Sequence, residues 1–284
     1  MDKSAALGLL VDELCRFARR LAGDGISLIV AGGVGLLLRD QHIRETEAAT
    51  LRAYPRLRAT SDIDLFLSAE IISDEQKTQR IRRLLDELGY KPVETAKYYQ
   101  FQRPLDDGAG LQVLKIDLLA PAAGSDNVKI TTRRIRPHGF NELHAHVTPE
   151  AVTVEEYLTR VSLDCEGGKG LVYLPHPFTY VVLKLFALRD RVDDPDKEYG
   201  RYHAFDIYVA LSMMTEVEYE QAIELAKRFS GTPQLEEARS IVDEFFGDVT
   251  GLGVIRIREH VRAVSIPEDD LDLAGLVTDL ADLF

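Results

Sequence analysis

Two aspartates separated by one residue are the sharpest candidates for chemistry in this chain. They lie in Thr-Ser-Asp-Ile-Asp-Leu-Phe-Leu, residues 60–67, a pattern typical of a strand. Alternate side chains of a strand share a face, so Asp62 and Asp64 are expected on one face about 6 to 7 Å apart. Such carboxylates repel unless a cation separates them, and Mg²⁺ or Mn²⁺ suits oxygen ligands and substrate phosphates. The alternative is a solvated strand face, because Asp-x-Asp is common in acidic proteins.

Two adjacent glycines are candidates for binding phosphate. Gly32 and Gly33 follow an apolar strand-like segment, residues 26–31, and precede a short helical pattern at residues 34–38. Glycine lets backbone N–H groups approach an anion, and a helix N-terminus adds partial positive charge. The alternative is a tight strand-to-helix turn without a ligand.

A third carboxylate stands in an apolar run. Asp117 lies within Val-Leu-Lys-Ile-Asp-Leu-Leu, residues 113–119. Burying a carboxylate is costly, which indicates a cationic partner or a metal. The alternative is an ion pair with Lys115 or with an arginine from another segment.

The elements that must position these residues alternate between helix and strand up to residue 150. The pattern predicts helices at 3–22, 34–38 and 73–88, the last ending at Gly89, and strands at 26–31, 60–67, 98–103, 111–119 and 143–147. Residues 40–58 are polar and Arg-rich, and are expected to form an exposed loop or insertion. This part is therefore expected to be α+β with a mixed sheet flanked by helices.

After residue 150 the pattern becomes mainly helical. Helices are predicted at 153–163, 178–191, 200–214, 217–229, 233–246 and 271–283, with separators that include residues 247–253. The economical division is a domain of residues 1–149 and a mainly α-helical domain of residues 150–284.

Composition limits the class of protein. The 284 residues are 45% hydrophobic and 29% charged, typical of a globular protein, and no apolar run reaches the roughly 20 residues that cross a bilayer. No signal peptide is evident, and the expected location is the cytoplasm without membrane association. Cys15 and Cys165 are far apart without a zinc-ligand pattern, so both are expected to be buried thiols.

The net charge of −13 argues against a nucleic-acid partner only until it is divided along the chain. Up to Glu150 the acidic and basic residues are equal in number, so the whole excess of acid falls after it. Any RNA contact is therefore expected from residues before Glu150, with basic stretches at 39–58, 77–83 and 129–136.

The order of these features resembles the nucleotidyltransferase fold of the DNA polymerase beta superfamily, over residues 26–119. Within it the chain looks most like the nucleotidyltransferases of the AbiEii/AbiGii toxin type. Two helical segments carry that second match: Lys-Leu-Phe-Ala-Leu-Arg-Asp-Arg at 184–191 and Arg-Tyr-His-Ala-Phe-Asp-Ile-Tyr at 201–208. The departures are the long insertion before Asp62, Gly33 where many members have Ser, and His203 where the family often has Asp.

The resemblance implies a two-metal-ion mechanism that transfers NMP from an NTP to a hydroxyl and releases pyrophosphate. Asp62, Asp64 and Asp117 would be the metal ligands for Mg²⁺, with Mn²⁺ as an alternative, and Asp117 would also help to activate the acceptor hydroxyl. The implied nucleotide-binding residues are Gly32, Gly33, Thr60, Ser61, Lys184 and Arg191.

The helical half would supply two further catalytic residues by the same resemblance. Lys184 would neutralise phosphate charge, and Asp206 would orient Lys184 or act on the acceptor. The alternatives are an exposed helical lysine for Lys184 and, for Asp206, an ion pair with Arg201 or with a neighbouring chain segment.

Three functions remain open from the sequence. The first is transfer to a tRNA 3′ end or another RNA, as a toxin with a cognate antitoxin protein. The second is transfer to a small molecule such as an aminoglycoside, or to a protein side chain. The acidic helical half fits a cationic small acceptor better than it fits RNA. The third is a non-catalytic nucleotide-binding module.

Overall fold

A computed structural model describes residues 3–58, 60, 62–106, 111–122, 128–131 and 133–284. The chain forms two compact units. Unit 1 contains Met1–Arg39, Arg58–Pro149 and Val154–Pro175, and unit 2 contains Asp40–Leu57, Glu150–Thr153 and His176–Phe284. Residues 40–57 thus belong to unit 2 and residues 154–175 to unit 1, and the domain boundary at residue 149 stays a prediction.

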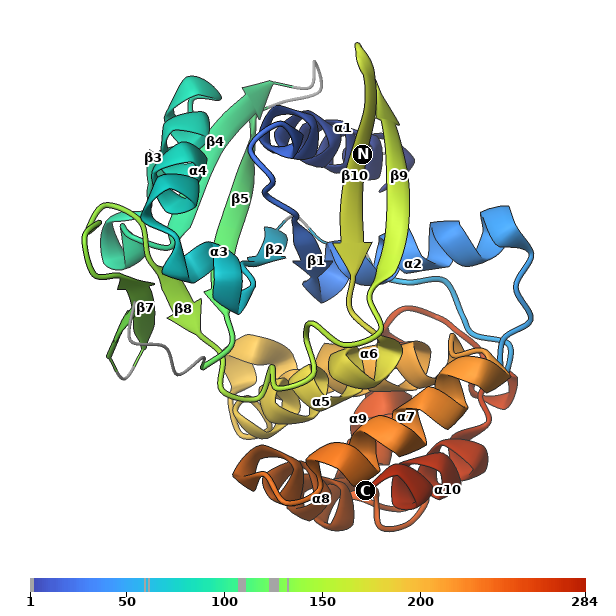
Figure 1. The fold of residues 1–284 in the computed structure, drawn as a ribbon. Helices are drawn as coiled ribbons and strands as arrows, with labels where there is room; N and C mark the ends of the chain where they lie inside the picture. Colours follow the sequence, from blue (N-terminus) through green and yellow to red (C-terminus); the bar gives the residue numbers. More distant parts are fainter. Residues whose placement is uncertain (1–2, 59, 61, 107–110, 123–127, 132) are drawn as a thin grey trace. The chain divides into compact units, whose positions relative to one another are not determined.

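Unit 1 is built on one mixed sheet with the strand order β6-β7-β8-β5-β2-β1-β10-β9 (Figure 1). Strands β3 and β4 extend it beside β5. The strands are β1 Ile29–Ala31, β2 Asp62–Phe66, β3 Lys91–Pro92, β4 Gln100–Asp106, β5 Leu111–Ala120, β6 Val128–Ile130, β7 Arg134–Pro137, β8 Ala145–Val147, β9 Thr159–Cys165 and β10 Gly168–Leu174. The helices are α1 Lys3–Ala22, α2 Gly32–Thr46, which continues into unit 2, α3 Ala69–Ser73 and α4 Glu75–Glu87, with a 3₁₀ turn at Glu94–Ala96.

The core of unit 1 lies on one face of this sheet. Helix α1, confirmed over the predicted range, buries Leu14, Phe17 and Leu21 at helical spacing. Strands β2 and β5 contribute alternate residues such as Ile63 and Ile116 to the same core. Because alternate side chains point to opposite faces, the aspartates of these strands project from the other face.

Two elements of unit 1 differ from the predicted ones. The helix expected at 73–88 is α4, which starts at Glu75 because the Asp74 carboxylate accepts hydrogen bonds from the backbone N–H groups of Gln76 and Lys77, and α3 before it was not predicted. Helix α2 runs on to Thr46, through the beginning of the expected loop. In the part of the expected loop that follows α2, Arg52 forms ion pairs with Asp272 and Asp279. This arginine therefore connects two segments of unit 2 and does not lie in a free, solvated loop.

The helix predicted at 153–163 is wrong, because this segment leads into the β9–β10 hairpin, the long ribbon at the right of the sheet in Figure 1. Val161 and Leu163 on β9 are buried with an exposed residue between them. This period of two indicates a strand with one buried face, and β10 pairs in parallel with β1.

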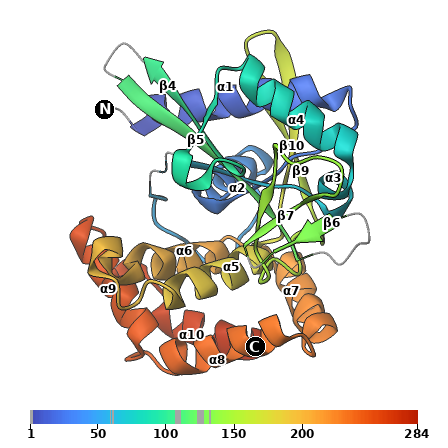
Figure 2. The same ribbon diagram turned by 90° about the vertical axis from the view of Figure 1, so that its left-hand side faces the viewer.

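Unit 2 is a set of helices, followed from yellow to red in Figures 1 and 2. They are α5 Pro177–Arg189, α6 Arg201–Ser212, α7 Glu216–Phe229, α8 Pro233–Phe246, α9 Leu252–Ala263 and α10 Leu273–Leu283, with 3₁₀ turns at Pro195–Gly200 and Glu268–Asp270. Five of these match predicted helices. Helix α9 was not predicted. Its N-cap residue is Gly251, so the helix begins within residues 247–253, which were expected to separate two helices. None of the helices described is long and apolar enough to span a membrane.

The expectation of two separate thiols is wrong: Cys15 and Cys165 form a disulfide between α1 and β9. Cys15 is fully buried, as expected, and Cys165 is half-buried. The pairing spans 150 residues of sequence, and no local spacing indicates a bond between cysteines so far apart.

Candidate active site

The first feature of the candidate site is the contact between the glycine turn and the acidic strand. Ala31 of β1 is paired with Asp64 of β2, and Gly32 follows directly with a φ of 60°. A Cβ on Gly32 would lie 2.8 Å from Asp64 Cγ and would overlap a carboxylate oxygen. Both the left-handed backbone and this close approach require glycine. The turn and the carboxylate that were predicted separately are therefore neighbours.

The second glycine meets the residue that leads into β2. A Cβ on Gly33 would lie 2.8 Å from Thr60 Cβ and 3.0 Å from its Oγ1. The Thr60 hydroxyl thus lies beside the N-terminus of α2, where backbone N–H groups have no partner within the helix. A helix N-terminus with an adjacent hydroxyl is suited to bind an anion. Ser61 was predicted to bind nucleotide as well, and it lies outside the described residues.

Three carboxylates share one face of the sheet. In the parallel pairing of β2 with β5, Asp64 is opposite Asp117 and Asp62 is opposite Lys115. Paired residues on parallel strands point to the same side, so Asp62, Asp64 and Asp117 all project from the face opposite the core. Asp62 and Asp64 are half-buried there. The predicted acidic residues are therefore gathered at one place in unit 1.

Asp117 is held by two neighbours through a single oxygen. Gln100 Nε2 donates to its Oδ2 at 3.2 Å, and Lys115 Nζ lies 3.4 Å from the same atom. The ion pair with Lys115 was one of the expected alternatives, and it is present. Oδ1 is buried without a hydrogen-bond partner among the described residues.

Burial is the main reason that the pKa of the Asp117 carboxyl is raised above its ordinary value. The negative charge of Asp62 raises this pKa further, whereas Lys115 and Gln100 oppose the shift. Gln100 was missed by the sequence reasoning, because it comes from β4 and meets Asp117 only through antiparallel pairing. Lys115 has a local signal, since it stands two residues before Asp117 on the same strand face.

The donor set partly fits a hard divalent cation. The unpartnered Oδ1 of Asp117 and two further carboxylates on its sheet face are oxygen donors of the type that Mg²⁺ prefers. Within the described residues, no three His, Cys, Asp or Glu side chains converge closely enough to form a complete metal site. Mg²⁺ usually binds one or two carboxylates and completes its shell with water and phosphate oxygens, so a protein-only cage is not required.

Unit 2 brings together the two charged residues predicted from the helical motifs. Lys184 Nζ on α5 donates to Asp206 Oδ2 on α6 at 2.7 Å, and 9% and 5% of the two side chains are exposed. The alternative of an exposed helical lysine is wrong. The ion pair of Asp206 is made with a residue of a neighbouring segment, Lys184, and Arg201 pairs with Glu198 at 2.8 Å. Lys184 and Asp206 therefore form a buried ion pair in which each neutralises the charge of the other.

Arg191 lies just after α5, and its guanidinium donates to the backbone carbonyl of Ala187 at 3.1 Å. This contact satisfies a carbonyl at the end of the helix. It gives Arg191 a local structural role, and its predicted contact with nucleotide stays a prediction.

Comparison with known proteins identifies no family for the chain. No family model matches it, and no curated protein matches it. Among solved structures, the chain is similar to the crystal structure of an antigenic nucleotidyltransferase-like protein from Paracoccidioides brasiliensis, with 16% identity and a TM-score of 0.45. The match covers 96% of this chain and 92% of that one.

Proposed function

We propose that this chain is a Mg²⁺-dependent nucleotidyltransferase that moves NMP from an NTP to an acceptor hydroxyl. The observation that carries the proposal is the contact of Gly32, at the N-terminus of α2, with Asp64, which is opposite Asp117 in the sheet. An anion-binding turn beside carboxylates on one sheet face suits a metal-bound triphosphate. In this proposal the backbone at Gly32 and Gly33 and the Thr60 hydroxyl bind phosphate oxygens.

Each carboxylate has a stated part in the proposed reaction. Asp62, Asp64 and Asp117 would hold Mg²⁺, with Mn²⁺ as a substitute, and the metal would neutralise charge on the triphosphate. Asp117 Oδ1, which has no partner among the described residues, takes the proton of the acceptor hydroxyl, the hydroxyl oxygen bonds to the α-phosphorus in line, and the bond from the α-phosphorus to the pyrophosphate oxygen breaks. Pyrophosphate leaves. From the resemblance alone, Lys184 and Arg191 neutralise phosphate charge, and Asp206 orients Lys184.

The sheet face favours a polyanionic acceptor over a cationic one. Leu119, two residues beyond Asp117, is opposite His146, and His146 is opposite Arg134. Arg134 therefore shares the face of the carboxylates, two strands or about 10 Å to the side of β5. Lys129 continues the same face on β6, because it is opposite Arg136 and Arg136 is two residues after Arg134. This row of basic residues supports RNA as the acceptor.

Labelling experiments test the reaction. The protein is incubated with Mg²⁺, each α-labelled NTP and total RNA, and incorporation is compared among wild type, Asp64→Asn and Asp164→Asn. Asp164 is the matched control, because it is an exposed carboxylate on β9 of the same sheet with an ion pair to Lys169. We expect Asp64→Asn to abolish labelling and Asp164→Asn to retain it. Equal labelling by wild type and Asp64→Asn would refute the proposal.

A second assay distinguishes the acceptors. RNA, protein and amino sugars are offered together, and the double variant Lys129→Ala/Arg134→Ala is compared with wild type. RNA labelling that falls at least tenfold in the variant, with unchanged NTP binding in calorimetry, supports an RNA acceptor. Labelling of the amino sugar or of protein instead supports the alternative acceptors.

The toxin role is tested in growing cells. We propose, from the family resemblance, that RNA modification by this chain arrests growth and that a cognate antitoxin protein counters it. Induced expression of wild type is expected to stop growth, whereas Asp62→Ala at equal protein level is not. Normal growth with an active wild-type enzyme would remove the toxin role and leave the reaction in place.

A further inference from the structure

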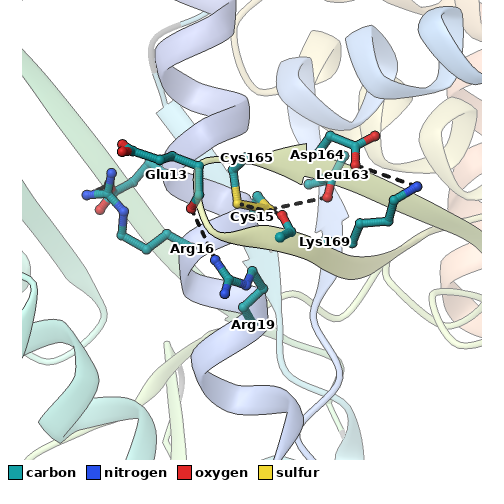
Figure 3. The surroundings of a disulfide bond; sticks show 10 residues. Glu13, Cys15, Arg16, Arg19, Leu163, Asp164, Cys165 and Lys169 are labelled. Atoms are coloured by element: carbon teal, nitrogen blue, oxygen red, sulfur yellow. Dashed lines mark hydrogen bonds and ion pairs between the residues drawn. A yellow bond between two sulfur atoms is a disulfide. The ribbon is translucent and has the colours of Figure 1, made fainter.

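The disulfide between Cys15 and Cys165 joins two elements that already pack closely (Figure 3). Their Cα atoms are 6.1 Å apart, within the usual range for a disulfide. Gly170 of β10 lies against the same turn of α1, and a Cβ there would lie 2.6 Å from the Cys15 carbonyl oxygen. The helix backbone therefore rests directly on the hairpin beside the covalent bond.

The surroundings of the two sulfurs can accommodate the thiols as well as the disulfide. Cys15 Sγ lies 3.2 Å from the carbonyl oxygen of Leu163, and Cys165 Sγ lies 3.4 Å from that of Gly168. After reduction, each thiol has a carbonyl oxygen to which it can donate. Reduction therefore leaves no buried polar group without a partner at these two sulfurs.

The two sulfurs differ in access. Cys15 is 0% exposed, whereas Cys165 is half-buried at the end of β9, next to the exposed turn of residues 166–168. The guanidinium of Arg19 donates to the Glu166 carbonyl in this turn at 3.2 Å. Arg19 thus holds the backbone of the turn beside Cys165, the sulfur that an external thiolate can reach.

We propose that Cys15 and Cys165 form a reversible thiol–disulfide exchange site, with Cys165 as the reactive sulfur and low-molecular-weight thiols as the co-reactant. A thiolate attacks Cys165 Sγ, the bond between the cysteines breaks, and Cys15 leaves as a thiolate that takes up a proton. A second external thiolate attacks the external sulfur of the mixed disulfide and releases Cys165. One protein disulfide is reduced, and two external thiols are oxidised to their disulfide.

The consequence is control over the stability of the sheet next to the candidate active site. β10 pairs with β1 at Tyr173 and Ile29, and the Tyr173 N–H donates to the Leu28 carbonyl at 2.9 Å. β1 ends at Ala31, directly before Gly32. The oxidised bond therefore fixes α1 to β9, the outer strand of the hairpin whose inner strand β10 pairs with β1, and it restricts a 150-residue loop in the unfolded chain.

Thermal unfolding of the intact chain tests the proposal without any assay of nucleotidyl transfer. Wild type is equilibrated in oxidised or reduced glutathione, free thiols are counted by alkylation after denaturation, and both forms are melted. We expect zero and two free thiols, and a Tm about 5–10 °C higher for the oxidised form. The Tm of Cys165→Ser should equal that of the reduced wild type in both buffers. Two free thiols in the oxidised sample, or equal melting temperatures, would overturn the proposal.

Mass spectrometry identifies the reactive sulfur. In oxidised glutathione, the native Cys15→Ser variant should gain one glutathione on Cys165, whereas Cys165→Ser should gain at least tenfold less on buried Cys15. Equal or reversed labelling would contradict the assignment of Cys165. Cys15→Ala and Cys165→Ala repeat the comparison should either serine variant fold poorly.

Discussion

Gly32 and Asp64 are in such close contact that no side chain fits at Gly32 without displacing the carboxylate. The two residues are 32 positions apart in the chain and meet because β1 and β2 pair antiparallel, with Ala31 opposite Asp64. This contact fixes both the backbone that would bind phosphate and the carboxylate that would bind metal. A change at Gly32 is therefore expected to affect folding and activity together.

Gly32→Ala should lower the free energy of unfolding by at least about 2 kcal/mol, from left-handed strain and from overlap with Asp64. Nucleotidyl transfer should be lost even below the melting temperature. Chemical denaturation followed by circular dichroism measures the first effect. Gly23→Ala is the matched control, since nothing lies within 4 Å of its added Cβ and its φ is not positive. If Gly32→Ala lowered the free energy of unfolding no more than Gly23→Ala does, the close contact of Gly32 with Asp64 would be refuted.

Asp117→Asn should abolish transfer while it raises Tm at pH 7. The pKa of Asp117 is raised, mainly by burial, so the folded state binds its proton more tightly than the unfolded state. Ionisation at neutral pH therefore costs stability, and asparagine removes this cost. The gain should vanish once the pH falls below the ordinary aspartate pKa of 3.8.

Calorimetry at pH 7 measures this gain, with the exposed Asp164→Asn as the control that changes Tm little. A lower Tm for Asp117→Asn would show that the contacts of Asp117 with Lys115 and Gln100 outweigh its burial.

His144 is expected to make unit 1 less stable in acid. Burial, assisted by Arg134 and Arg136, lowers the pKa of His144 from 6.5 to about 4. The unfolded chain binds its proton more tightly, so the stabilising effect is complete above pH 6.5 and is lost as the pH falls from 6.5 to 4. His144→Phe keeps a ring to stack on Tyr98 and should flatten the dependence of Tm on pH in this window.

Melting curves at pH 7.5, 6.0 and 4.5 give this comparison. His138→Phe changes an exposed histidine near β7 and should keep the wild-type slope. His146, whose pKa is also lowered by burial and by Arg133, should leave some residual slope in His144→Phe. An unchanged slope in His144→Phe would contradict the assignment.

The Lys184–Asp206 pair should behave as a buried ion pair. Lys184→Met alone is expected to cost about 3–5 kcal/mol, because it removes the ammonium group that neutralises the buried Asp206 carboxylate. Lys184→Met/Asp206→Leu should be more stable than either single variant and should still lack transfer activity. A double-mutant cycle by urea denaturation measures the coupling. Arg201→Met, which removes the more exposed pair with Glu198, is the control and should change stability by less than about 1 kcal/mol.

The sequence alone determined the features that depend on local periodicity. The apolar spacing of α1 defined that helix, and the alternation around Ile63 placed Asp62 and Asp64 on one strand face. These patterns follow from the geometry of helices and strands and need no distant partner.

Only the tertiary structure decided the relationships between distant segments. Strand pairing brings Gln100 to Asp117 and places β9 and β10 in unit 1, although β9 was predicted as a helix. Helix packing makes Asp206 the partner of Lys184, a pairing that the family resemblance implied but no local pattern specified, and chain closure over 150 residues pairs Cys15 with Cys165. Each outcome depends on burial and on long-range pairing. A carboxylate or a thiol carries no local signal that specifies which remote group will become its neighbour.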